Sequence, residues 1–157
     1  MSIKSSIQEI KRRNYSRSIS KKILQGGENL GIYGKIDIVN PHKLSIGSNC
    51  SINHGAYINA YNPITIGNDV TISAGVSIIS TGIDYVEWSN GHKQHLKNDG
   101  IFIGDHVWIG SRAQIIGEVK ITGKYVVIAA GAVVTKDITE DYVVVAGIPA
   151  KIIKKYK

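Results

Sequence analysis

Aliphatic residues return every six positions along most of the chain, and a small or polar residue usually follows each of them. The pattern is most regular between residues 46 and 81, where its members are Ile46, Ile52, Ile58, Ile66, Ile72 and Ile78. Neither an α-helix nor a simple alternating strand keeps a period of six. A short strand followed by a turn does, and three such units wind once around a triangular prism with an aliphatic axis. The pattern therefore predicts a solenoid.

The first 24 residues have a different pattern, with isoleucines at helical spacing and basic residues between them. The isoleucines are Ile3, Ile7, Ile10, Ile19 and Ile23. We expect a helix that ends at Gly26-Gly27 and packs an apolar stripe on the open end of the solenoid, which needs a cap. A basic helix on a membrane surface is the alternative interpretation.

Residues 82–100 interrupt the period with a polar stretch, and the period resumes at Ile103. A long insertion inside a regular domain is usually functional, so this excursion loop is the first place to look for chemistry. Gly147-Ile148-Pro149 then ends the coil. We expect three parts: a helical cap at residues 1–30, a solenoid at residues 31–148 and a basic C-terminal tail at residues 149–157.

Composition narrows the class of protein without identifying it. The 157 residues suit one domain, and 43% hydrophobic with 7% aromatic residues suits an Ile- and Val-lined interior. One cysteine excludes an internal disulfide and a cysteine-rich metal site. There is no long apolar run, so we expect a cytoplasmic protein. The net charge of +7 comes with no nucleic-acid-binding motif, and membrane association has no support beyond that charge.

Three segments together resemble one family, the hexapeptide-repeat acyltransferases, and within it the galactoside, maltose and polysaccharide O-acetyltransferase group. These segments are residues 103–111 (IGDHVWIGS), 129–137 (AAGAVVTKD) and 145–154 (VAGIPAKIIK). The resemblance covers about residues 44–155. It implies an all-β, left-handed parallel β-helix that forms homotrimers, with acetyl-CoA bound between adjacent subunits. The expected function is acetyl transfer to a hydroxyl of a sugar or polysaccharide, with no metal.

The same resemblance assigns roles residue by residue. The expected acetyl-CoA contacts are Trp108, Ser111, Ala130, Thr135, Lys136, Lys151 and Lys154. Lys151 and Lys154 stand where the family usually has arginine. A lysine ammonium is a point charge, whereas an arginine guanidinium donates two parallel hydrogen bonds. The expected acceptor contacts are Asn53, Asp84, Tyr85 and Trp88. The two aromatic residues suit the apolar face of a sugar, or they pin the loop to a neighbouring subunit.

The general base is the one role that the family pattern leaves open. Galactoside-type relatives carry a histidine directly after Thr-Gly, and here Thr81-Gly82 is followed by Ile83, which transfers no proton. A histidine suits this step because its pKa lies near neutrality. Two histidines lie in the excursion loop: His95 is the first candidate and His92 the second. Of the others, His106 is interpreted as structural, His54 as a turn residue, and His42 has no assigned role.

Two other classes of function compete with sugar O-acetylation. An N-acetyltransferase acting on a nucleotide-linked amino sugar would keep the fold and cofactor, but such relatives carry an additional N-terminal domain. A non-catalytic β-helix, or one that binds zinc through three histidines, is less consistent with the segments at residues 129–137 and 145–154.

Overall fold

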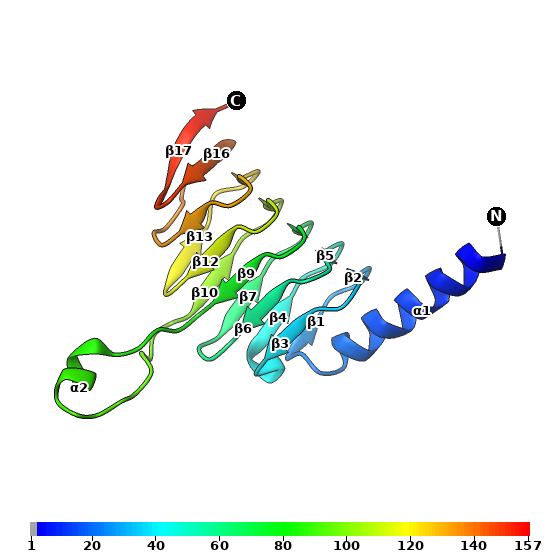
Figure 1. Ribbon diagram of the computed structural model, residues 1–157. Helices are drawn as coiled ribbons and strands as arrows, with labels where there is room; N and C mark the ends of the chain where they lie inside the picture. Colours follow the sequence, from blue (N-terminus) through cyan, green and yellow to red (C-terminus); the bar gives the residue numbers. More distant parts are fainter. Residues whose placement is uncertain (1–2) are drawn as a thin grey trace.

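A computed structural model describes residues 3–157, with side chains from Ser6 onward, and its strands form three sheets that enclose a prism (Figure 1). Sheet A consists of β1 (Gln25–Gly26), β4 (Leu44–Ile46), β7 (Ile64–Ile66), β10 (Ile101–Ile103) and β13 (Val119–Ile121). Sheet B consists of β2 (Gly31–Tyr33), β5 (Ser51–Asn53), β8 (Thr71–Ile72), β11 (Trp108–Ile109), β14 (Val127–Ile128), β16 (Val143–Gly147) and β17 (Ala150–Lys155). Sheet C consists of β3 (Asp37–Val39), β6 (Tyr57–Asn59), β9 (Ser77–Ile79), β12 (Gln114–Ile116) and β15 (Val133–Val134).

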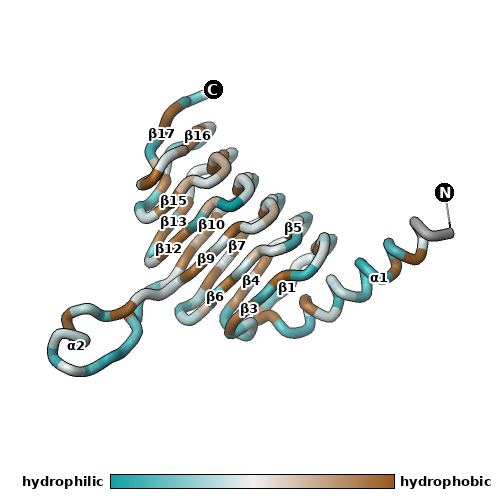
Figure 2. The backbone as a smooth tube through the Cα atoms, in the orientation of Figure 1, coloured by the Kyte–Doolittle hydropathy of each residue, from teal (hydrophilic) through white to brown (hydrophobic). Residues whose placement is uncertain are grey.

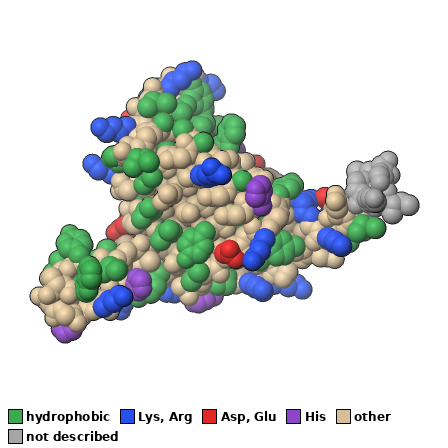
Figure 3. Space-filling model, in the orientation of Figure 1, with side chains coloured by type: hydrophobic (Ala, Val, Ile, Leu, Met, Phe, Trp, Pro, Cys, Tyr) green, Lys and Arg blue, Asp and Glu red, His purple; other side chains and the backbone are tan. Residues whose placement is uncertain are grey.

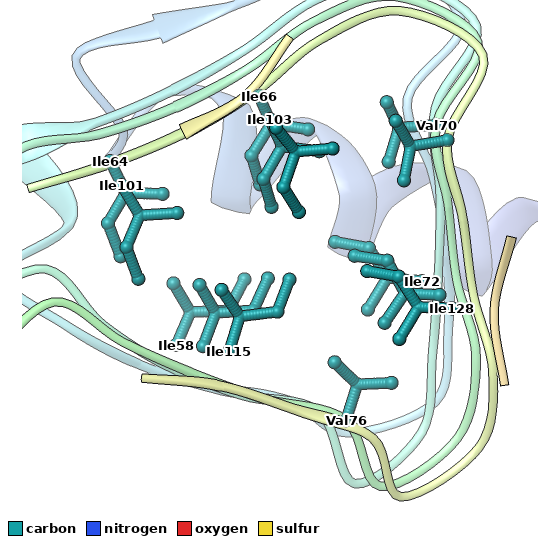
Figure 4. Close-up of a cluster of buried hydrophobic side chains, with 14 of the residues drawn as sticks. Ile58, Ile64, Ile66, Val70, Ile72, Val76, Ile101, Ile103, Ile115 and Ile128 are labelled. Carbon is teal, nitrogen blue, oxygen red and sulfur yellow. The ribbon is translucent and has the colours of Figure 1, made fainter. Parts of the chain in front are cut away.

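The inward side chains stack in columns along the prism axis. In sheet B, for example, Ile52 pairs in parallel with Ile72, Ile72 with Ile109 and Ile109 with Ile128. All of these side chains are buried. Figure 4 shows isoleucines from the three sheets meeting on the axis, and Figure 2 shows hydrophobic positions recurring from coil to coil. The predicted parallel β-helix is confirmed, and its coils already begin at β1.

Helix α1 (Ile3–Ser20) covers the N-terminal end of the prism. The buried Ser16 hydroxyl accepts a hydrogen bond from the Ile32 amide at 3.0 Å, so the helix satisfies an edge donor of β2. The predicted apolar stripe is wrong in its N-terminal half: Ile7 and Ile10 are 47% and 58% exposed, because the helix projects beyond the prism. No described helix is long and apolar enough to cross a membrane.

The excursion loop leaves the prism after β9 and returns at β10, between sheets C and A. It contains a short helix, α2 (Tyr85–Ser89), whose first amides are capped by the Asp84 carboxylate. Gly100 closes the loop with a φ of +85°, and a side chain there would collide with the Pro63 carbonyl. A single 3₁₀ turn, η1 (Pro41–Lys43), precedes β4.

The C-terminal segment forms a strand. Residues 149–157 were expected to be a basic tail, but β17 pairs antiparallel with β16 and continues sheet B beyond the last coil. The hydrogen bonds that β16 leaves open at the end of the solenoid are thereby filled by the chain itself.

The stacked core generates a prediction about stability. Replacing the fully buried Ile109 by alanine should lower the free energy of unfolding by about 2–5 kcal/mol, because the cavity breaks an axial column. The matched control is Ile10→Ala on the exposed part of α1, which should change it by less than about 0.5 kcal/mol. Urea denaturation followed by circular dichroism measures both; equal effects would contradict the axial core.

Candidate functional site

A row of unpaired backbone amides runs along the corner between sheets B and C. The backbone N–H of the second corner residue donates a hydrogen bond to a carbonyl of the preceding coil. Gly131 N–H, for example, donates to the Ser111 carbonyl at 2.9 Å. Within the described residues, the first corner residue of each coil has no hydrogen-bond acceptor for its own N–H. From the coil of β5 onward, these first residues are His54, Ala74, Ser111 and Ala130. Successive coils are about 4.8 Å apart, so the row offers evenly spaced donors to an extended ligand.

Trp108 lies beside this row on the outer face of sheet B. Its side chain is 56% exposed, and its indole Nε1 donates a hydrogen bond to the Ser73 hydroxyl at 3.1 Å. The indole is therefore held across the sheet and leaves a face open to solvent. Asn53, from the same sheet, donates from its amide to the Ile72 carbonyl at 3.1 Å, which leaves its side-chain oxygen available.

The predicted cofactor lysines lie at the C-terminal end of the same sheet. On β17, Lys151 pairs with Ala146 and Lys154 with Val144, so both lysines continue sheet B. Thr135 and Lys136 are exposed but follow β15, at the far end of sheet C. The predicted cofactor residues therefore occupy two faces of the chain.

His95 stands directly opposite Ile83 in an antiparallel pair. The flanking bonds run from Leu96 N–H to the Gly82 carbonyl at 2.9 Å and from Asp84 N–H to the Gln94 carbonyl at 3.0 Å. This pattern makes the pair a non-hydrogen-bonded one, in which the two Cα atoms are about 4.5 Å apart. Directly opposed side chains also lie on the same face of a two-stranded ladder. The His95 imidazole therefore projects from nearly the same place as the side chain of residue 83.

Neighbouring groups hold the backbone beside His95 and contact its ring. The buried Asn62 donates to the Ser80 carbonyl at 2.7 Å and to the Leu96 carbonyl at 3.0 Å, which ties the returning arm of the loop to the prism. The His95 ring lies on Tyr61, with centroids 4.7 Å apart. Lys43 in turn donates to the Tyr61 carbonyl at 2.7 Å. His95 thus has an ordered setting although it lies in an inserted loop.

His92 is placed differently, farther out on the same loop. Its Nδ1 lies 3.3 Å from a carboxylate oxygen of Glu87, and its side chain is largely exposed. Tyr85 and Trp88, on α2, are 74% and 58% exposed, and Figure 3 shows hydrophobic side chains gathered over this part of the loop. Asp84 serves as the cap of α2.

The two halves of the predicted site do not meet within one chain. Sheet B and its row of amides form one side of the prism, while His95 lies at the opposite corner, between sheets C and A. Figure 4 shows this division: Ile72 and Ile128 point inward from sheet B, across the axis from the corner beside Ile58 and Ile64. Among the described residues, no group of three or more His, Cys, Asp or Glu side chains is arranged to hold a metal.

The fold and these surfaces define a class, the hexapeptide-repeat β-helix proteins, and comparison with known proteins agrees. The family model "Hexapeptide repeat of succinyl-transferase" matches residues 43–80 and 100–136. Galactoside O-acetyltransferase of Escherichia coli is 37% identical over 124 residues, which are 73% of this chain and 58% of that protein. The chain spans about half the length of the first curated relatives that it matches.

Solved structures give the same result. A galactoside acetyltransferase in complex with coenzyme A has 30% identity and a TM-score of 0.70, over 88% of this chain and 68% of that one. A hexapeptide-repeat acetyltransferase of Vibrio cholerae, complexed with acetyl coenzyme A, has 25% identity and a TM-score of 0.81, over 92% and 78%. The chain belongs to the hexapeptide-repeat acetyltransferase family. Serine acetyltransferases and an N-acyltransferase of the same fold also match, so family membership leaves the acceptor open.

Several residues of the site had no assigned role in the sequence analysis. Asn62, Tyr61 and Ser73 act through contacts with segments 34 or 35 residues away, which no local pattern encodes. The phase of the repeat could have located the row of amides, because it assigns each coil's residues to strand or corner.

The setting of His95 generates a prediction about the loop. Replacing Asn62 by alanine should free the returning arm, because it leaves the buried Ser80 carbonyl without its side-chain donor and removes the bond to the Leu96 carbonyl, at a cost of about 1–3 kcal/mol. Trypsin should then cut faster after Lys93 and Lys97, as followed by mass spectrometry. The matched control is Asn90→Ala at the exposed end of α2, which should leave cleavage nearly unchanged. Equal cleavage in both variants would mean that Asn62 does not hold the loop.

Proposed function

We propose that this chain is an acetyl-CoA-dependent O-acetyltransferase that modifies a hydroxyl of a sugar or polysaccharide. The observation that carries the proposal is the pairing of His95 with Ile83. Galactoside-type relatives, which this sequence resembles, have their histidine base at the position of Ile83. The cross-strand arrangement supplies an imidazole beside that position from the other arm of the loop.

His95 acts as the general base in this mechanism. An imidazole nitrogen takes the proton from the acceptor hydroxyl while that oxygen attacks the thioester carbonyl of acetyl-CoA. The carbon–sulfur bond then breaks, and the imidazolium returns the proton to the departing thiolate. Tyr61, against which the His95 ring lies, limits the orientations of the imidazole.

Acetyl-CoA lies along sheet B in this proposal. The free amides of Ser111 and Ala130 donate to the carbonyl groups of the pantetheine arm, and Trp108 covers that arm with its exposed indole face. Lys151 and Lys154 lie at the adenosine end, where they neutralise phosphate charge. The thioester then points toward the N-terminal coils, where Asn53 contacts the acceptor.

A homotrimer brings the two halves of the site together. His95 of one subunit and sheet B of the next meet across an interface, because a single prism keeps them on opposite sides. Exposed apolar side chains on both halves, Trp88 on the loop and Trp108 on sheet B, support such burial. Thr135 and Lys136 follow the last strand of sheet C and do not lie on sheet B. In the trimer they contact the cofactor held by the neighbouring subunit.

The proposed base has a direct test. Replacing His95 by alanine should lower kcat by about two to four orders of magnitude, because the attacking hydroxyl keeps its proton. Adding Ile83→His to this variant should restore part of kcat from the opposite position of the ladder. His92→Ala is the matched control and should stay close to the unaltered enzyme. Thiol release from acetyl-CoA with a panel of hydroxyl and amino sugars is the assay; strong loss in His92→Ala alone would transfer the role to His92.

The proposed contact of Lys151 with the adenosine end of acetyl-CoA is tested separately. Lys151→Ala should raise the KM for acetyl-CoA several-fold with little change in kcat, because the lysine contacts a part of the cofactor that does not react. Lys155→Ala is the matched control, since the Lys155 ammonium lies 3.5 Å from Glu140 and outside the proposed contacts. An equal rise in KM for both variants would indicate a general charge effect.

A further inference from the structure

A polar hollow separates helix α1 from the first two coils of the prism. Its volume is about 570 Å³. Side chains of the helix form one wall, and the outer face of β2 and β5 with the neighbouring corner forms the other. Its polar lining residues include Arg12, Arg13, Ser16, Arg17, Asn29 and Asn49. None of these residues belongs to the cofactor or catalytic groups described above.

The charge of this hollow is positive and incompletely balanced. Helix α1 has five basic residues in its sequence and one acidic residue, Glu9. Arg13 and Arg17 are one helical turn apart and lie on the same face, so their like charges repel. Glu9 contacts Arg12 and Arg13, but none of the described side chains forms an ion pair with Arg17. An anion in the hollow would relieve this repulsion.

Arg12 is held as a fixed part of the wall. Its guanidinium makes two hydrogen bonds to the Glu9 carboxylate and lies 4.7 Å from the centre of the Tyr33 ring. The hydrogen bond from Arg12 holds the pKa of Glu9 below its usual value, so the carboxylate stays charged and keeps Arg12 in place. Arg17 is then the donor most free to bind a ligand, and Arg13 donates to Glu9 through its Nε and can add its terminal nitrogens.

The hollow continues the face on which the cofactor is proposed to lie. Gly31, at its edge, pairs with Ser51, Ser51 with Thr71, and Thr71 with Trp108. Because Ser51 also lines the hollow, two strand spacings separate it from Trp108, roughly 10 Å along the prism. A sugar ring with a diphosphate attached is of comparable length. A group bound in the hollow would thus be the far end of an acceptor whose hydroxyl reaches the thioester.

We infer that the acceptor carries a phosphate or diphosphate group, which Arg13 and Arg17 bind in the hollow beneath α1. This inference rests on the proposed acetyl transfer and specifies its substrate class: a sugar phosphate ester, either soluble or attached to a lipid. Guanidinium groups suit this ligand because their planar donors match two phosphate oxygens at once.

Binding of inorganic pyrophosphate to the whole chain tests the inference without any acetyl transfer. Isothermal titration calorimetry should show binding that weakens about tenfold in Arg17→Gln and Arg13→Gln, as expected for loss of a charged hydrogen bond. Arg17→Lys should lose less, because it keeps the charge. The matched control is Lys11→Gln, on the same helix but outside the hollow, which should change the affinity less than twofold. Acetyl-CoA binding, measured in the same variants, should be unchanged.

Two results would overturn the inference. One is acetyl-CoA binding without any pyrophosphate binding, which would leave the proposed activity standing and remove the phosphate site. The other is equal loss of pyrophosphate affinity in Lys11→Gln and Arg17→Gln, which would mean diffuse attraction to a basic helix. Sedimentation with phosphatidylcholine vesicles containing phosphatidylglycerol distinguishes a membrane role. Vesicle binding that depends equally on Lys11 and Arg17, with no pyrophosphate binding, would make α1 a membrane-surface helix instead.

Discussion

The axial stacking of aliphatic side chains is the constraint on which the rest of this structure depends. Each coil must present its isoleucines and valines at the same three inward positions, because the parallel register places every one on the residue of the next coil. A shift of one residue would turn a column outward. The inward positions are thus committed to stability. Chemistry is restricted to outward positions, corners and insertions.

The proposed site uses all three of these. In the described part of the chain, the corner between sheets B and C leaves the first amide of successive coils unpaired, so the backbone supplies a regular row of donors without any special sequence. An outward strand position supplies Trp108, and an inserted two-stranded ladder supplies His95. A straight prism cannot fold back on itself to join its opposite sides. Association of identical chains is a simple way to bring such surfaces together.

The sequence predicted the fold far better than the site. The six-residue period was sufficient because each coil depends on local spacing and on its immediate neighbours. The apolar stripe of α1 failed at Ile7 and Ile10, since spacing along a helix does not show where the supporting surface ends. The pairing of His95 with Ile83 depends on the antiparallel register of an irregular loop, which no periodic pattern encodes. The strand at β17 was hidden for a similar reason: its partner exists only once the last coil has formed.

Mixed oligomers test the central claim, that one active site is built from two chains. His95→Ala and Trp108→Ala subunits, each first shown to have little activity alone, are co-expressed with different tags and purified as hybrids. If the loop of one subunit serves sheet B of the next, every trimer that contains both variants has an intact pair at one interface, which is about a third of the sites. Thiol release should then recover toward a third of the original rate. Hybrids that remain as inactive as the two parent variants would contradict a site shared between subunits.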